Sequence, residues 1–239
     1  MKTALVTGGS RGIGEAIVRL LSKSGYSVAF TYKNSEERAL LLARESGALA
    51  IRADNTDENE IKCAVDRAVR ELGRIDCLVN NAGVSVFGLV TETETEEWEQ
   101  VFKTNVDGAY KYAKYTVPDM LKRHSGRIIN ISSVWGLVGS SNEVCYSSAK
   151  AALVGMTKAL AKELAPSGIT VNAVAPGVID TEMNGVLSDE EMSSLVGEIP
   201  LGRIGKPEDV AAAVLFLAGD GGSYITGEVI NVSGGFVIN

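Results

Sequence analysis

Residues 7–14 read Thr7-Gly8-Gly9-Ser10-Arg11-Gly12-Ile13-Gly14, directly after an apolar, strand-like run and at the start of a helix-like segment. In this context, glycines let the backbone approach a pyrophosphate at the amino end of a helix. The spacing is G-x-x-x-G-x-G rather than G-x-G-x-x-G, so the glycine roles are shifted from the usual dinucleotide fingerprint. A glycine-rich turn alone would also fit a plain strand-to-helix connection, so the rest of the chain must decide.

Short apolar, β-rich runs alternate with helix-like segments along the whole chain. This alternation is typical of a parallel sheet with helices on both faces. The predicted strands are Thr3–Val6, Val28–Tyr32, Ala48–Arg52, Cys77–Val79, Arg127–Ile131, Thr170–Val174 and Val229–Val232. The predicted helices are Gly14–Ser24, Ser35–Glu45, Glu58–Leu72, Glu96–Lys122, Tyr146–Leu164 and Pro207–Leu217. We therefore predict an α/β fold, a Rossmann-type doubly wound seven-stranded parallel sheet, formed by residues 1–239 as a single domain.

The periodicity weakens between Ile179 and Leu201, where only a short helical stretch around Asp189–Leu195 is expected. Irregular segments of this kind often close over a site. We predict a substrate lid over residues 179–201.

The composition restricts the possible functions. A chain of 239 residues with 45% hydrophobic content can bury a full core, and a net charge of -7 without a basic run argues against nucleic-acid binding. Cys63, Cys77 and Cys145 lack a C-x-x-C spacing, which argues against disulfides or a zinc site, and we expect the first two in the core. The single histidine, His124, cannot build a metal cluster. No long apolar stretch supports export or membrane spanning, so we expect a soluble, cytoplasmic protein without a metal.

Tyr146 and Lys150 lie four residues apart, and Tyr146 follows Ser133 by thirteen residues. On a helix, positions i and i+4 share a face, so the ammonium can lie near the phenol and favour its phenolate. A phenol with a free pKa of about 10 then becomes a usable general acid or base near neutral pH. Taken alone, such a pair is more often an exposed helix face.

Further motifs follow in a fixed order, namely Asn80-Asn81-Ala82-Gly83, Asn105, Pro176-Gly177, Ile225-Thr226-Gly227 and Gly234-Gly235. Together with residues 7–14, Ser133, Tyr146 and Lys150, they make the chain similar to short-chain dehydrogenases/reductases. Within that family it resembles bacterial 3-oxoacyl-[acyl-carrier-protein] reductases. The resemblance runs essentially from end to end, and it implies an NADPH-dependent reduction of a ketone to a secondary alcohol.

The resemblance implies catalytic roles for Asn105, Ser133, Tyr146 and Lys150. Tyr146 protonates the ketone oxygen, Ser133 orients and polarises it, and Lys150 lowers the pKa of Tyr146 and holds the nicotinamide ribose. Asn105 joins Lys150 to a proton relay through water. Alternatively, Ser133 is a loop hydroxyl bonded to its own backbone and Asn105 a polar group inside a helix. An NADP-binding sensor without turnover would share the cofactor end but would have a broken catalytic set.

The choice of cofactor can be argued from charge. NADP needs a cation for its phosphate, whereas NAD usually meets an acidic side chain at the end of the second strand. That strand ends Thr31-Tyr32-Lys33-Asn34, and Arg11 and Lys33 could both reach the phosphate, so we predict NADP(H), although both can also be plain surface cations. By resemblance, Asp54 contacts the adenine, and Ile179 and Thr181 approach the nicotinamide amide. The implied cofactor-binding residues are Gly8, Ser10, Arg11, Gly12, Ile13, Gly14, Lys33, Asp54, Asn81, Ala82, Gly83, Tyr146, Lys150, Pro176, Gly177, Ile179 and Thr181.

The groups that select the ketone fall in the segment from Trp135 to Glu143 and in the predicted lid. Trp135 is either the wall of an apolar pocket or a core residue. Carrier-protein reductases often have a basic residue where this chain has Ser167, but Lys122, Arg123 and Arg127 offer a local basic patch for an acidic carrier. We predict a 3-oxoacyl group on acyl carrier protein as the substrate.

A second substrate is indicated by Glu143-Val144-Cys145-Tyr146 and by Gly177-Val178-Ile179-Asp180-Thr181-Glu182-Met183-Asn184. These stretches are similar to reductases that act on a 5-aminopentanone group on elongation factor P. The resemblance also implies a homotetramer, with Glu96–Lys122 and Tyr146–Leu164 at one interface and Val229–Asn239 at another. The apolar end Phe236-Val237-Ile238 fits burial at a subunit contact.

Overall fold

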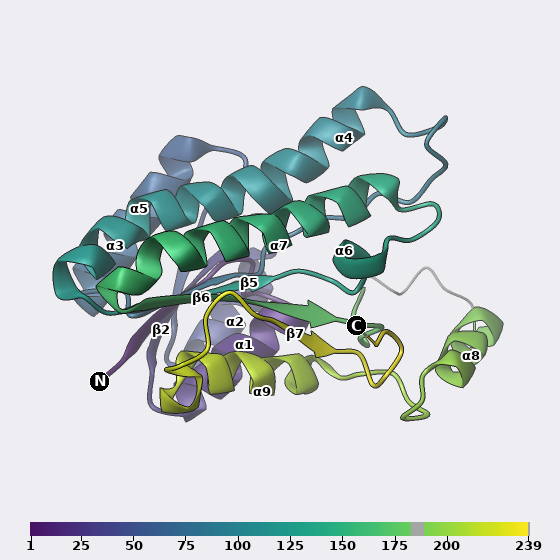
Figure 1. Ribbon diagram of the computed structural model, residues 1–239. Helices are drawn as coiled ribbons and strands as arrows, with labels where there is room; N and C mark the ends of the chain where they lie inside the picture. The colour runs from purple at the N-terminus through teal and green to yellow at the C-terminus, as the bar shows by residue number, and fades with distance from the viewer. Residues whose placement is uncertain (183–188, 239) are drawn as a thin grey trace.

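The computed structural model describes residues 1–182 and 189–238, whose strands form one parallel sheet in the order β3-β2-β1-β4-β5-β6-β7 (Figure 1). The strands are β1 Thr3–Val6, β2 Ser27–Tyr32, β3 Leu49–Arg52, β4 Cys77–Asn80, β5 Gly126–Ile131, β6 Ile169–Pro176 and β7 Val229–Val232. The α-helices are α1 Gly12–Lys23, α2 Glu36–Ser46, α3 Glu58–Leu72, α4 Thr95–Phe102, α5 Gly108–Arg123, α6 Trp135–Val138, α7 Val144–Leu164, α8 Asp189–Glu198 and α9 Pro207–Ala218. The predicted seven-stranded, doubly wound fold is confirmed.

Two helical layers cover the sheet (Figure 1). One core lies under α1, α2 and α9, where Ile17 and Leu21 of α1 pack with Val214 of α9. The other lies under α3, α5 and α7, where Ile61 and Tyr112 are fully buried. Because both faces of the sheet are covered, its inner strands read as continuous apolar runs instead of alternating ones, and β1 is buried along its whole length.

The strand order reverses between β1 and β4, which are direct neighbours. The chain leaves the carboxyl end of β1 toward one face and that of β4 toward the other, so a crevice opens between the two connections. Residues 7–14 follow β1, and Asn81-Ala82-Gly83 follow β4. The fold therefore brings the two glycine-containing motifs together at one edge of the sheet.

The prediction of one continuous helix over Glu96–Lys122 is wrong, because this helix is interrupted in the structure. The structure has α4, a π-helical segment Lys103–Asp107, and then α5. A single wider turn of this kind leaves no trace in a 3.6-residue pattern, and such turns are frequent at functional sites. The short helix α6 was not predicted either. His124 ends α5 in a left-handed conformation with φ 49°.

Cys63 is exposed, against the expectation of a core position, whereas Cys77 is buried. The buried face of α3 carries Ile61, Ala64, Val65 and Ala68, and Cys63 lies on the opposite side of the helix. In the region of the predicted lid, helix α8 spans Asp189–Glu198, and residues 183–188 lie outside the described part of the chain. A parallel bridge between Ile179 and Gly205 joins the flanks of the region.

Candidate active site

The loop after β1 is shaped by its glycines and held from two sides. Gly8 and Gly12 have φ values of 63° and 53°, in the left-handed region that favours glycine. A Cβ on Gly14 would collide with the carbonyl oxygen of Gly8. The Asn81 side-chain amide donates to the carbonyls of Thr7 and Gly8 at 2.9 and 3.0 Å, which ties this loop to the one after β4.

Helix α1 begins at Gly12, so its first backbone N–H groups face the crevice beside this loop. Arg11 precedes the helix and supplies no side-chain acceptor for these groups, which suits a bound anion better than a closed cap. Thr181 lies beside the same turn, because a Cβ on Gly12 would be 3.5 Å from its methyl group. The close-packed glycines, the free helix end and the crevice position fit a dinucleotide pyrophosphate.

Ser133, Tyr146 and Lys150 meet at the carboxyl end of β5. Ser133 lies in the loop after this strand, and Tyr146 and Lys150 lie one turn apart near the start of α7. The Ser133 side chain is close enough to the Tyr146 phenol to lower the pKa of that phenol. The Lys150 Nζ atom is 5.4 Å from the centre of the Tyr146 ring. The three residues that the sequence placed in one site are therefore neighbours.

Lys150 is deeply buried and anchored to the end of β5. Its Nζ donates to the Ile131 carbonyl at 2.8 Å, and its own carbonyl accepts a 2.9 Å hydrogen bond from the Ser132 hydroxyl. Burial lowers the pKa of Lys150 to about 8, because removal from water disfavours the charged form. The side chain is thus held in place by the strand that also delivers Ser133.

Burial has the largest effect on Tyr146 and raises its pKa above the ordinary value. The Glu143 carboxylate raises the pKa further, and the Ser133 side chain opposes both effects. The expected lowering of the Tyr146 pKa by Lys150 is therefore not observed. The physical reason is that desolvation of the phenol outweighs its favourable contacts with neighbouring side chains.

Asn105 lies in the π-helical segment and clamps the chain after β4. Its Oδ1 accepts from the Val84 N–H at 2.8 Å, and its Nδ2 donates to the Val84 carbonyl at 2.9 Å. A Cβ on Gly83 would lie 3.3 Å from Asn105 Oδ1 and 3.4 Å from Lys150 Nζ. The bare backbone of Gly83 therefore lets Asn105 and Lys150 approach the same point.

The remaining predicted cofactor residues line the same edge of the sheet. The Val134 N–H donates to the Pro176 carbonyl at 3.0 Å, which joins the ends of β5 and β6, and Gly177 packs against Ser233. Ile179 is buried. Ser10 and Ile13 belong to the loop and first turn already described, and Ala82 packs against Gly8. All these positions lie at the carboxyl edge of the sheet.

Lys33 forms an ion pair with Asp54, with 2.7 Å between Nζ and Oδ2. Burial by itself would raise the pKa of Asp54, but hydrogen bonds from Lys33 and Thr56 outweigh it and hold the pKa below its ordinary value. Arg11 pairs with Glu182 at 3.0 Å, and Arg38 of α2 pairs with the other oxygen of the same carboxylate. Sequence reasoning missed Arg38 and Glu182, because nothing in their local patterns connects them.

Glu143 was predicted only as part of the substrate-selecting segment from Trp135 to Glu143, without a role of its own. It precedes α7 directly, and its carboxylate is half-buried and accepts from the Ser85 hydroxyl at 3.2 Å. Burial raises the pKa of Glu143, and hydrogen bonds from the uncharged Ser85 and Ser140 hydroxyls only partly offset this. Trp135 is half-buried and packs edge-on against Phe236, with ring centres 5.5 Å apart. The carboxyl-terminal segment thus packs against the short helix α6 that follows β5.

The basic patch expected from Lys122, Arg123 and Arg127 is not near this site. Arg127 lies at the beginning of β5, whereas Ser133 follows its end, so they are separated by the length of the strand, about 20 Å. Arg123 is also occupied, because it pairs with Asp76 at 3.0 Å and with Asp119 at 2.8 Å. These cations cannot act beside Tyr146.

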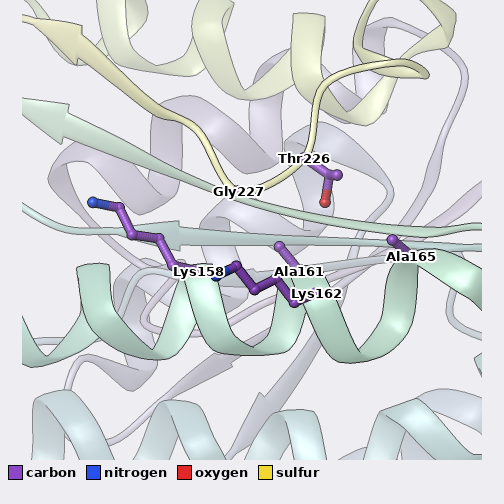
Figure 2. A pocket seen from close by; sticks show the side chains of 6 residues that line it. All are labelled: Lys158, Ala161, Lys162, Ala165, Thr226 and Gly227. Carbon is purple, nitrogen blue, oxygen red and sulfur yellow. The ribbon is translucent and has the colours of Figure 1, made fainter.

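A cavity of about 440 Å³ lies between the second half of α7 and the loop before β7, and Figure 2 shows the side chains that line it. It is lined by Lys158, Ala161, Lys162, Ala165, Thr226 and Gly227. Lys158 lies twelve residues after Tyr146 on the same helix, about 18 Å along its axis. This cavity is therefore separate from the cluster around Tyr146.

In the described part of the chain, no group of His, Cys, Asp and Glu side chains is arranged to hold a metal ion, and none of the helices there could span a membrane.

The fold, the glycine loop and the Ser133–Tyr146–Lys150 cluster agree with the comparison with known families. The profile of the family described as Enoyl-(Acyl carrier protein) reductase matches residues 8–237. The chain belongs to this family, a branch of the short-chain dehydrogenases/reductases. It is an oxidoreductase that acts on a CH–OH/C=O group, and its family uses a nicotinamide cofactor.

Among curated proteins, the chain is similar to the 3-oxoacyl-[acyl-carrier-protein] reductase FabG of several bacteria. It is 44% identical to that of Staphylococcus aureus strain N315, over 98% of this chain and 97% of the relative. It is 45% identical to that of Aquifex aeolicus strain VF5, over 98% and 96% of the two chains. The protein of Thermotoga maritima is 42% identical, over 99% and 98%. The relatives are named for a 3-oxoacyl substrate, whereas the family description names an enoyl substrate.

Proposed function

We propose that this chain catalyses the NADPH-dependent reduction of 3-oxoacyl-[acyl-carrier-protein] to 3-hydroxyacyl-[acyl-carrier-protein]. The main support is the cluster of Ser133, Tyr146 and Lys150, which lies at the same edge of the sheet as the glycine loop. A phenol and a hydroxyl that point to one place can both bind a carbonyl oxygen. The names of the similar proteins from Staphylococcus, Aquifex and Thermotoga support the 3-oxoacyl substrate.

The glycine loop and the residues after β4 would hold a nicotinamide cofactor, which would supply the hydride for the ketone carbon. Tyr146 donates its phenolic proton to the ketone oxygen as negative charge develops there, while the Ser133 hydroxyl donates a hydrogen bond to the same oxygen. The raised pKa keeps the Tyr146 phenol protonated at neutral pH, as a proton donor requires. The Lys150 ammonium then stabilises the phenolate that remains, and Asn105 fixes the backbone beside Lys150.

The test is the loss of NADPH absorbance with an acetoacetyl thioester, in wild type and in Tyr146→Phe. We expect the substitution to lower kcat by about 10²- to 10⁴-fold, the usual contribution of a general acid, with NADPH binding retained. Tyr224→Phe is the matched control, because Tyr224 is fully exposed in the chain. Near-normal turnover by Tyr146→Phe would contradict the assignment. Tight NADPH binding without turnover on any ketone would favour a sensor.

The preference for NADP(H) over NAD(H) is part of the proposal. It is supported by the absence of an acidic residue at the end of β2 and by the nearby cations Arg11 and Lys33. An NADP phosphate near these cations gains charge-assisted hydrogen bonds that NAD cannot make. If charge reversal at both residues leaves the preference for NADPH over NADH unchanged, this part of the proposal is wrong.

A second candidate substrate is a 5-aminopentanone group on elongation factor P, and Glu143 favours it. Its carboxylate lies close enough to Tyr146 to raise the pKa of that phenol, and its hydrogen-bond partners are uncharged. A partly buried carboxylate in such surroundings attracts a cationic group. An aminoketone brings an ammonium to this place, whereas a 3-oxoacyl thioester has no cationic group in its acyl chain.

Glu143→Gln separates the two substrates, because it removes the charge and keeps the shape. For an aminoketone substrate, we expect kcat/KM to fall about tenfold or more, as for the loss of a charged hydrogen-bond partner. For the acetoacetyl thioester, we expect an unchanged or higher kcat/KM. Turnover of the ketone-modified factor that does not depend on Glu143 would refute its role in binding the amine.

We also propose that the protein works in the cytoplasm as a homotetramer. Phe87, Val90 and Ile238 are 75%, 70% and 84% exposed in the single chain, which is unusual for large apolar side chains. Contacts through α4, α5 and α7 on one side and the segment after β7 on the other would cover them. Light scattering coupled to size-exclusion chromatography tests the assembly, and a monomer at micromolar concentration would refute it.

A further inference from the structure

Glu182 connects two parts of the adenosine side of the crevice. One oxygen of its carboxylate accepts from Arg11 Nη1 at 3.0 Å, and the other accepts from Arg38 Nη1. Arg11 belongs to the glycine loop, whereas Arg38 lies in the first turns of α2, just after β2. Glu182 is 144 residues from Arg38 in the chain. Two guanidinium groups from separate elements therefore converge on one anion.

The two arginines hold Glu182 as an anion. Hydrogen bonds from Arg38 and then from Arg11 lower the pKa of the carboxylate. All three side chains are more than half exposed, at 60%, 58% and 53% for Arg11, Arg38 and Glu182. Exposed ion pairs contribute little net stability, because water competes for both charges. A more highly charged anion can therefore replace the carboxylate at small cost.

The position of the two arginines indicates which anion this is. The end of β2 is where dinucleotide-binding folds meet the adenosine ribose, and the glycine loop meets the pyrophosphate beside it. A phosphate on the ribose 2′-oxygen would lie between these places. It carries more negative charge than a carboxylate and offers three acceptor oxygens to the two guanidinium groups.

We propose that Glu182 occupies, between Arg11 and Arg38, the position that the 2′-phosphate of NADP takes on binding. Arg38 then binds the 2′-phosphate together with Arg11, and Glu182 competes with it. Binding of NADP displaces the Glu182 carboxylate from the arginines, whereas NAD has no group that does so. The inference rests on the proposed use of NADP(H), and it makes Arg38 and Glu182 specificity-determining residues for the cofactor.

Lys33 is less suited to this role, although it also follows β2. Its Nζ is 2.7 Å from Asp54, a carboxylate that is held further by two hydrogen bonds from Thr56. A phosphate near Lys33 would have to overcome this fixed negative charge. We therefore expect Lys33→Gln to affect the binding of the 2′-phosphate less than Arg38→Gln does.

The experiment measures binding to the adenosine end alone, without turnover. The probes are 2′,5′-ADP and 5′-AMP, titrated by calorimetry into wild type, Arg38→Gln, Glu182→Gln and Arg44→Gln. Arg44 is the matched control, an exposed arginine near the other end of α2. We expect Arg38→Gln to weaken 2′,5′-ADP about tenfold, as for one lost charge-assisted contact, and to leave 5′-AMP unchanged. Glu182→Gln should tighten 2′,5′-ADP about threefold or more, again without an effect on 5′-AMP.

Each outcome decides the proposal. Unchanged 2′,5′-ADP affinity in Arg38→Gln, equal losses for both probes, or unchanged or weaker 2′,5′-ADP binding in Glu182→Gln would overturn it. Wild type that binds 5′-AMP as tightly as 2′,5′-ADP would overturn it together with the NADP preference. The protein could also show the expected affinities for 2′,5′-ADP and 5′-AMP and yet fail to reduce the acetoacetyl thioester. That result would uphold this inference and refute only the proposed reaction.

Discussion

Burial shifts the pKa values of the two central residues of the site, Tyr146 and Lys150, in opposite directions. Removal from water raises the pKa of the Tyr146 phenol and lowers that of the Lys150 ammonium to about 8, because in both cases the neutral form is favoured. Lys150 is only 4% exposed and donates to a backbone carbonyl rather than to a carboxylate. Its charge is therefore poorly compensated in the free protein. A group that we propose takes part in catalysis is held here at a cost in stability.

This cost predicts a specific dependence of stability on pH. The folded-state pKa of Lys150, about 8, lies below the 10.5 of an unperturbed lysine. Between these values the unfolded chain binds more protons than the folded one, so the free energy of unfolding rises with pH. Relative to Lys150→Met, which has no titratable group, wild type should gain about 2 kcal/mol between pH 7 and pH 10.

The measurement is urea unfolding of both proteins at pH 7, 8.5 and 10. The difference between the two free energies of unfolding removes the contributions of groups that titrate in both proteins. A difference that stays constant over this range would mean that Lys150 keeps its ordinary pKa. A difference that changes in the opposite sense would mean that a partner raises the pKa above 10.5.

At the scale of elements, α7 is tied to the sheet by a buried polar chain. The Asn80 amide donates to Asn130 at 2.9 Å, the Asn130 amide donates to Thr157 at 2.8 Å, and the Thr157 hydroxyl donates to the Leu153 carbonyl at 2.8 Å. Asn80 lies in β4, Asn130 in β5 and Thr157 in α7. These hydrogen bonds thus fix the position of α7, which carries Tyr146, relative to β5, which leads to Ser133.

We expect Thr157→Val to lower the free energy of unfolding by about 1 to 3 kcal/mol, because the Asn130 amide loses its acceptor in a buried place. Valine keeps the shape of threonine, so no cavity contributes. Thr157→Ser is the control that keeps the hydroxyl and should retain the hydrogen-bond contribution, apart from the lost methyl group. Urea unfolding measures both variants. Equal stability of wild type and Thr157→Val would show that this chain of hydrogen bonds does not anchor α7.

At the scale of the whole molecule, the crevice is assembled from both halves of the sheet. The loop after β1 is tied to the loop after β4 by Asn81, and the ends of β5 and β6 are joined by the hydrogen bond from Val134 to Pro176. A ligand that lies across this edge contacts segments far apart in the chain. Its binding should therefore stabilise the fold as a unit, and not one loop alone.

NADPH at a hundredfold excess over its Kd should stabilise the protein by about 2.7 kcal/mol, which corresponds to a rise in Tm of about 5 to 10 °C. Gly14→Ala should abolish most of this shift, because the added methyl group collides with the Gly8 carbonyl and displaces the loop. Differential scanning fluorimetry with and without NADPH measures both. Cooperative melting of Gly14→Ala without NADPH verifies that the variant is folded. A full shift in that variant would contradict the assigned position of the pyrophosphate.

Most of the architecture could be predicted from the sequence, because its signals are local. The alternation of apolar runs with helical patterns predicted the seven strands in their observed order along the chain, and the glycine loop predicted the start of α1 to within two residues. The order of motifs predicted which side chains meet at Tyr146. The prediction of one continuous helix over Glu96–Lys122 failed. The π-helical turn there contains Asn105, whose side chain forms hydrogen bonds with the backbone of the distant Val84, and a local pattern cannot reveal such contacts.

The sequence by itself determined the parallel sheet, the crevice motifs and the Ser133–Tyr146–Lys150 cluster, since periodicity, turn chemistry and fixed spacing all act over short stretches of chain. Only the tertiary structure decided the pairing of Glu182 with Arg11 and Arg38, the half-buried charge of Glu143 beside Tyr146, and the lowered pKa of Lys150. These properties arise from burial and from contacts between residues far apart in the chain, and neither leaves a periodic pattern in the amino-acid sequence.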